Sequence, residues 1–128
     1  MLYQKILIVD DDDDILQVMD KKLTAGGFKV IRAKRGMEAV EKAKAEMPDL
    51  ILMDIVLPDI DGSEAVKLIH GEPATQQIPV IFVSGILAKD SGGHPTTELK
   101  VAGLKYHALS KPFAFETLMK EIEHILIQ

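Results

Sequence analysis

Several residue types that would mark particular protein classes are missing or scarce in this sequence of 128 residues. There is no cysteine, which excludes disulfide bonds, thiolate metal sites and cysteine nucleophiles. Tryptophan is absent and aromatic residues make up only 5% of the chain, so a platform for stacking nucleic-acid bases is poorly supplied. The net charge of -5 also argues against a basic face. We therefore expect no direct binding of nucleic acid.

Long apolar segments are missing as well. No run approaches the roughly 20 residues that a membrane span requires, and the first residues do not combine a basic region with an apolar stretch. We therefore expect a cytoplasmic protein without a membrane partner. The length and a hydrophobic fraction of 47% are typical of one globular domain. The expectation is a single domain over residues 1–128, with no output domain among them.

The hydrophobic pattern alternates between short apolar runs and longer segments with helical spacing. The apolar runs, typical of strands buried on both faces, are 6–9, 29–31, 50–53, 80–83 and, more weakly, 108–109. The helical segments between and after them have apolar residues at intervals of three and four, clearest over 115–126. This order predicts an α/β fold, in which right-handed crossovers build a parallel sheet covered by helices on both faces.

The crossover between the last two predicted strands is irregular. It contains a cluster of helix-breaking residues, Ser91–Pro95. We expect a flexible loop there, followed by a short helix near Thr96–Ala102.

Side chains suited to phosphate chemistry follow several of the predicted strands. Asp10 and Asp11 come after the first strand, Asp54 after the third, Ser84 after the fourth and Lys111 after the fifth. In a doubly wound sheet these carboxyl ends meet at the ligand-binding edge. Crowded carboxylates need a cation, and oxygen ligands of this kind suit Mg²⁺. An ammonium and a hydroxyl beside them can contact phosphoryl oxygens. The set therefore fits phosphoryl transfer onto an aspartate.

Four motifs in this order resemble the receiver domain of two-component response regulators, and the resemblance covers essentially the whole chain. They are Ile6–Asp11, Leu52–Pro58 with Asp61 and Gly62, Val83–Gly85, and Ser110–Phe113. The resemblance implies a flavodoxin-like (βα)5 fold with a five-stranded parallel sheet in the order 2-1-3-4-5.

The resemblance also implies roles for individual residues. Asp54 matches the phosphoacceptor of the family, and Asp10 and Asp11 match its acidic pair. Mg²⁺ would be bound by these three carboxylates together with the main-chain carbonyl of Val56.

Two further positions match groups that contact the phosphoryl group. Ser84 corresponds to the switch hydroxyl and Lys111 to the phosphate-pairing lysine. The family usually holds the peptide bond after this lysine in the cis form, which makes Lys111–Pro112 the candidate here.

The sequence departs from the family at two points. The aromatic switch residue of the family lies three positions before the lysine, where this chain has Ala108, although Tyr106 and His107 are close by. The segment from Ser84 to Lys111 also looks several residues longer than usual. Both departures concern the switch and leave the acidic site intact.

The resulting hypothesis is a phosphorylation-dependent signalling domain. A histidine kinase or histidine phosphotransfer protein would donate the phosphoryl group to Asp54, and the affinity for a downstream protein target or output domain would change. The domain would assist its own phosphorylation and dephosphorylation without being an enzyme in the usual sense. The main alternative is a binding module of the same fold that works independently of phosphorylation. An aspartate-nucleophile phosphatase is disfavoured because Val56 stands where that chemistry needs a second carboxylate.

The remaining acidic residues have simpler explanations. Asp13 or Asp14 is well placed to cap the first helix. Asp59 and Asp61 are expected to shape the turn between Pro58 and Gly62 rather than to bind metal.

Overall fold

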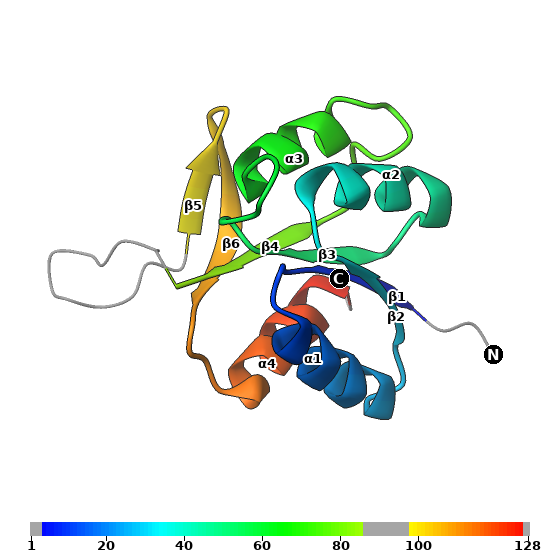
Figure 1. The fold of residues 1–128 in the computed structure, drawn as a ribbon, viewed down its shortest axis with the longest axis vertical. Helices are drawn as coiled ribbons and strands as arrows, with labels where there is room; N and C mark the ends of the chain where they lie inside the picture. The colour runs from blue at the N-terminus through cyan, green and yellow to red at the C-terminus, as the bar shows by residue number, and fades with distance from the viewer. Residues whose placement is uncertain (1–3, 86–97, 127–128) are drawn as a thin grey trace, which may run out of the picture.

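The computed structural model describes residues 4–85 and 98–126. These residues form six strands and four helices, drawn in Figure 1, and strands and helices alternate as far as β4. No described helix is long and apolar enough to cross a membrane. In chain order the elements are β1 Lys5–Val9, α1 Asp13–Ala25, β2 Lys29–Ala33, α2 Gly36–Glu46, β3 Leu50–Met53, α3 Gly62–His70, β4 Val80–Ser84, β5 Glu98–Val101, β6 Leu104–Ser110 and α4 Phe115–Leu126.

The strands form one sheet in the order β2-β1-β3-β4-β6-β5. The first five strands of that order are parallel, and they correspond to the five strands that the sequence predicts. The predicted order 2-1-3-4-5 is therefore confirmed, and the fold is flavodoxin-like. Helices α2 and α3 cover one face of the sheet, and α1 and α4 cover the other (Figure 1).

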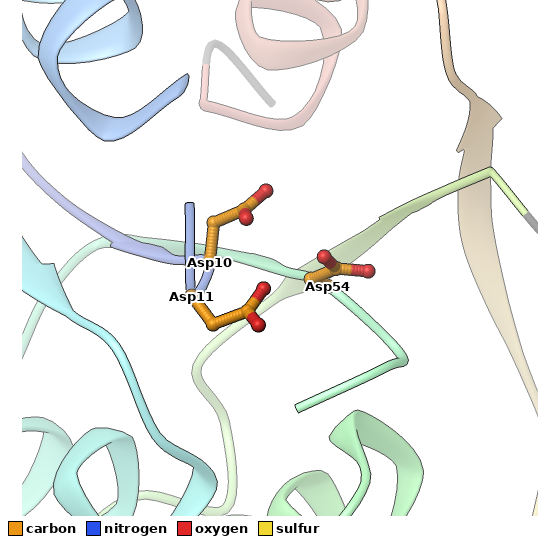
Figure 2. A group of neighbouring side chains, drawn as sticks. All are labelled: Asp10, Asp11 and Asp54. Carbon is orange, nitrogen blue, oxygen red and sulfur yellow. The ribbon is translucent and has the colours of Figure 1, made fainter. Parts of the chain in front are cut away.

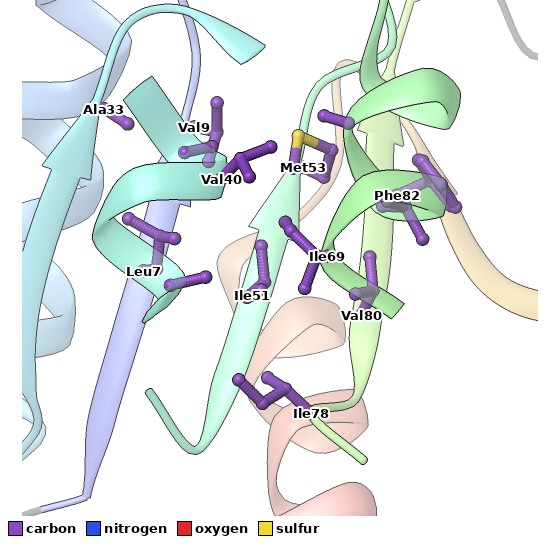
Figure 3. Close-up of a cluster of buried hydrophobic side chains, with 14 of the residues drawn as sticks. Leu7, Val9, Ala33, Val40, Ile51, Met53, Ile69, Ile78, Val80 and Phe82 are labelled. Atoms are coloured by element: carbon purple, nitrogen blue, oxygen red, sulfur yellow. The ribbon is translucent and has the colours of Figure 1, made fainter. Parts of the chain in front are cut away.

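Alternate residues of each central strand supply two separate cores. On β3, Ile51 and Met53 pack under α2 and α3, whereas Leu50 and Leu52 face α1 and α4. Figure 3 shows the first of these clusters, in which Leu7, Val9 and Phe82 continue the same face on neighbouring strands. This division follows from the two-residue side-chain period of a strand. It explains why the central strands appear in the sequence as unbroken apolar runs.

The prediction of a short helix near Thr96–Ala102 is wrong for the described part of that segment. Glu98–Val101 forms β5, which pairs antiparallel with β6 and adds a sixth strand at the edge of the sheet. Ala102 and Gly103 connect the two strands with φ values of 53° and 82°. Two successive residues with positive φ form the type of turn that closes a tight hairpin and cannot continue a helix. The predicted loop before it falls on residues 86–97, outside the described residues.

Three aspartates fix the starts of three helices. Asp12, rather than Asp13 or Asp14, caps α1, because its Oδ1 accepts hydrogen bonds from the backbone N–H of Asp14 at 2.9 Å and of Ile15. Asp61 caps α3 in the same way. Helix α2 has no such residue of its own.

The N-terminus of α2 is instead capped by Asp59, from the segment after β3. Its two carboxylate oxygens accept hydrogen bonds from the backbone N–H of Gly36 at 2.8 Å and of Met37 at 2.9 Å. The hydrogen bond from Met37, together with that from Gly36, lowers the pKa of Asp59 to about 2. Asp59 therefore does more than shape its own turn, because it joins the loop that follows Asp54 to a neighbouring helix.

We expect Asp59→Ala to lower the melting temperature at neutral pH, because two helix N–H groups lose their acceptor. Asp59→Asn keeps one acceptor oxygen, so its melting temperature should lie between those of wild type and Asp59→Ala. The folded-state pKa is depressed, so this contribution is complete above the ordinary aspartate pKa and is lost as pH falls towards about 2. Melting curves from pH 7 down to pH 3 should show the gap between wild type and Asp59→Ala narrowing below about pH 4. A gap of constant size would contradict the capping role.

Candidate functional site

The backbone brings the predicted site residues to one end of the sheet. Asp10 and Asp54 follow the adjacent parallel strands β1 and β3, and the N–H of Asp54 donates to the carbonyl of Val9 at 3.0 Å. The next two strands, β4 and β6, are also neighbours. The N–H of Lys111, which follows β6, donates to the carbonyl of Ser84 at the end of β4 at 2.9 Å. The carboxyl ends of four strands therefore carry the acidic, hydroxyl and amine groups, as the fold predicts.

Three carboxylates gather where β1 and β3 end, as Figure 2 shows. Ligand oxygens from Asp10, Asp11 and Asp54 all lie within 4.8 Å of one another. Asp10 and Asp54 are nearly buried, with 6% and 8% of their surface exposed, while Asp11 is exposed to solvent. The cluster is therefore open on the side of Asp11 and closed towards the core.

Lys111 is the cation of this site. Its Nζ donates to Oδ2 of Asp10 at 2.5 Å and to Oδ2 of Asp54 at 3.2 Å. Burial acts to lower the pKa of Lys111, but the hydrogen bond and charge of Asp10, together with Asp54, outweigh it and raise this pKa. Lys111 therefore stays charged at neutral pH and bridges two of the three carboxylates. The peptide bond between Lys111 and Pro112 is cis, as the resemblance predicts.

The surroundings of the Asp54 carboxyl disfavour its charged form. Burial raises its pKa, the negative charge of Asp10 raises it further, and Lys111 opposes both without cancelling them. Its Oδ1 accepts a hydrogen bond from the backbone N–H of Val56 at 3.3 Å. This contact brings the Val56 backbone beside Asp54, while the Val56 side chain is 53% exposed. The role of the Val56 carbonyl as a metal ligand stays a prediction.

The donor set fits a divalent cation. Among residues 4–85 and 98–126, three carboxylates face one ammonium, which leaves an excess of negative charge that a hard cation would neutralise. The ligand atoms are all oxygens, one side is open to water, and the distances are short enough to share an ion. The three carboxylates that the sequence suggests as Mg²⁺ ligands, those of Asp10, Asp11 and Asp54, therefore lie together.

Ser84 is almost fully buried, at 1% exposure, at the end of β4. Ala108 lies on β6 beside Phe82 and is also buried. On the same strand, Tyr106 packs edge-on against Phe82 with ring centroids 5.5 Å apart. Tyr106 therefore lies on the same face of the sheet as Ala108.

A hydrogen-bonded histidine holds Tyr106 in place, and the sequence does not single out this histidine. His70, at the end of α3, has Nδ1 at 2.9 Å from the Tyr106 hydroxyl and Nε2 at 2.7 Å from the carbonyl of Ile78. The two rings also stack at 5.6 Å. No local pattern indicates this contact, because the partners are 36 residues apart. His107 lies elsewhere, with Nδ1 at 3.3 Å from Glu121 of α4.

Comparison with known proteins identifies the family of this chain, and the family agrees with the geometry of the acidic site. The family described as "Response regulator receiver domain" matches residues 6–123. This chain is a response regulator receiver domain. Protein PilH of Pseudomonas aeruginosa is 34% identical over 122 residues, which cover 95% of this receiver domain and 97% of PilH. Among solved structures, the chemotaxis protein CheY4 of Vibrio cholerae superposes with a TM-score of 0.80 at 27% identity, over 98% of this chain and all of that one.

Another relative is much longer than this receiver domain. The transcriptional regulatory protein PhoP of Bacillus subtilis is 32% identical over 123 residues, which are 96% of this chain but only 48% of PhoP. The receiver domain therefore spans about half the length of that relative and nearly all of PilH. In both comparisons, the matched part of this chain is the part that carries its acidic site.

Proposed function

We propose that this receiver domain accepts a phosphoryl group on Asp54. One observation carries the proposal. Asp54 is nearly buried at a strand end, with two other carboxylates and the Lys111 ammonium around it. Such a site combines a carboxylate nucleophile with charges that can stabilise the transferring group.

Apart from one proton taken from water, the phosphodonor and this chain supply every atom that the chemical step needs. An Oδ atom of Asp54 attacks the phosphorus of a phosphohistidine on a histidine kinase or phosphotransfer protein. The O–P bond forms as the P–N bond breaks, and the electron pair of that bond stays on the imidazole nitrogen, which takes up a proton from water. Lys111, 3.2 Å from Asp54, then lies beside the new phosphoryl oxygens and pairs with their charge. The Ser84 hydroxyl is the proposed donor to another of these oxygens.

Asp10, Asp11 and Asp54 are the residues that would hold Mg²⁺, together with the carbonyl of Val56. When bound, the ion supplies positive charge to the phosphoryl oxygens and reduces repulsion among the carboxylates. Asp10 also accepts a hydrogen bond from the N–H of Asp12 at 3.0 Å, which holds its carboxylate in place.

The product of this step is a signal rather than a released compound. Phosphorylation adds negative charge and acceptor oxygens next to Lys111 and Ser84. The proposed result is a changed affinity for a downstream protein, so the domain acts as a regulated acceptor rather than as a classical enzyme. The partners proposed here are a phosphodonor protein and a protein target.

Incubation with acetyl phosphate and Mg²⁺ tests the proposal directly. We expect intact-mass spectrometry to show one added phosphoryl group, and none when the metal is chelated.

Mg²⁺ alone should raise the melting temperature, because it binds the native state. Asp11→Asn should remove most of both effects, whereas Asp13→Asn, a neighbouring exposed aspartate that pairs with Lys34, should leave them unchanged. Equal behaviour of the two variants would contradict the metal assignment.

A binding module that works without phosphorylation is the second candidate. Ala108 in place of an aromatic residue favours it, and so does the contact that holds Tyr106 to His70. A folded protein that binds Mg²⁺ but takes up no phosphoryl group would support this alternative.

A further inference from the structure

The outer edge of β5 is a part of the sheet that the acidic site does not use. Among the described residues β5 pairs on one side only, with β6, and it ends the sheet on the side opposite β2 (Figure 1). Glu98 and Lys100 are exposed there and Leu99 is half-buried. We propose that this edge pairs antiparallel with the same edge of a second copy of the chain and forms a symmetric dimer.

Within the described part of the chain, the backbone groups of β5 that β6 does not pair belong to two residues. Val101 and Leu104 flank the two-residue turn, and the pair that closes such a turn is hydrogen-bonded. Hydrogen-bonded and non-hydrogen-bonded pairs alternate along an antiparallel ladder. Leu99, like Val101, therefore directs its N–H and C=O towards β6, whereas Glu98 and Lys100 direct theirs outward.

One register of self-pairing satisfies these outward groups. Centring the two-fold axis on Leu99 places Glu98 opposite Lys100 of the second copy and Lys100 opposite its Glu98. Both positions have outward-directed groups, so each pair exchanges two backbone hydrogen bonds. Each pair also brings a carboxylate opposite an ammonium, a favourable cross-strand combination. Leu99 meets Leu99 of the second copy on the other face of the sheet.

The neighbouring registers with the same hydrogen-bond phase are unfavourable. Shifting the axis by one residue places Lys100 opposite Lys100, or Glu98 opposite Glu98, and like charges directly opposite destabilise strand pairing. Charged edge strands normally discourage association, but this arrangement of charges leaves one self-complementary register. A two-fold contact of this kind uses the same patch on both copies and closes after two chains.

The contact is short, so the expected dimer is weak and reversible. Sedimentation equilibrium on the unphosphorylated full chain should show a monomer–dimer equilibrium that shifts to monomer at high salt. Lys100→Glu should weaken dimerisation about tenfold or more, since two attractive cross-strand pairs become repulsive. Glu98→Lys should act likewise, and the double variant Glu98→Lys/Lys100→Glu, with the net charge of wild type, should restore the dimer. Lys29→Glu, the same charge change on β2 at the opposite edge, should have no effect.

Amide hydrogen exchange gives a second readout on the unaltered protein. Raising the concentration should slow exchange at the amides of Glu98 and Lys100, while Leu99 and Val101, already paired with β6, should change little. A chain that stays monomeric up to about 1 mM would overturn the proposal. So would a dimer indifferent to both charge reversals, because it would use another face. All substituted side chains are exposed, and thermal melting would verify that the variants fold.

Discussion

Asp54→Asn should reduce phosphoryl uptake from acetyl phosphate by at least about a hundredfold, to the background of the assay. The amide has nearly the same shape as the carboxylate but no anionic oxygen to attack phosphorus. Folding should survive the change, because burial and Asp10 already disfavour the charged form of Asp54. The melting temperature of Asp54→Asn should therefore be equal to or above that of wild type.

The matched control for this variant flanks the same strand. Asp49 directly precedes β3, as Asp54 directly follows it, and Asp49 accepts a hydrogen bond from the N–H of Lys5 at the far end of the sheet. Asp49→Asn makes the same chemical change without touching the acidic site, so its phosphoryl uptake should match wild type. Undiminished uptake by Asp54→Asn would identify another acceptor, which peptide mapping of the phosphorylated protein would locate.

The arrangement of the acidic site was predictable because a few strong local signals fix it. Each central strand is an apolar run short enough to end at a defined residue, so the residue after it falls at a known edge of the sheet. Asp10 and Asp54 follow such runs, and their positions needed no knowledge of the loops. Lys111 was harder to place, since β6 begins with the mixed residues Leu104–His107 and only the weak apolar run 108–109 marked the strand before it.

The hairpin at the sheet edge escaped prediction for a different reason. Glu98–Val101 does alternate polar and apolar residues, but four residues are too few to separate a strand from a helix by period alone. Its turn places Ala102 at a φ of 53°, which alanine rarely adopts, so nothing in the sequence marks the turn before Gly103. Contacts such as Asp59 to α2 and His70 to Tyr106 join distant segments and have no local signal at all.

Gly62 makes a close contact with the backbone of Asp54 that the local sequence does not indicate. In sequence it marks the turn that begins α3, where helix propensity alone would favour alanine. In the structure, a Cβ atom at this position would lie 2.0 Å from the carbonyl oxygen of Asp54 and 2.9 Å from Cγ of Met53. The N–H of Gly62 also donates to the carbonyl of Ile55 at 2.7 Å. The start of α3 therefore rests directly on the backbone of the proposed phosphoacceptor.

We expect Gly62→Ala to lower the free energy of unfolding by about 2–4 kcal/mol, because backbone atoms must move to admit the methyl group. The atoms displaced belong to Asp54, so the folded fraction should also take up the phosphoryl group more slowly than wild type. Urea denaturation gives the first quantity, and the rate of mass gain with acetyl phosphate and Mg²⁺, measured well below the melting temperature, gives the second.

Gly85→Ala is the control that separates this clash from a general effect of replacing glycine. A Cβ atom at Gly85 meets none of the described residues within 4 Å, so the stability of Gly85→Ala should change by less than about 1 kcal/mol, with a small gain from the stiffer unfolded chain. If Gly62→Ala were as stable as Gly85→Ala, the contact between α3 and Asp54 would have to be looser than the structure has it. If Gly62→Ala lost stability but kept the wild-type phosphorylation rate, α3 would move away and leave Asp54 in place. The two measurements together therefore show whether α3 or the backbone of Asp54 moves to admit the methyl group.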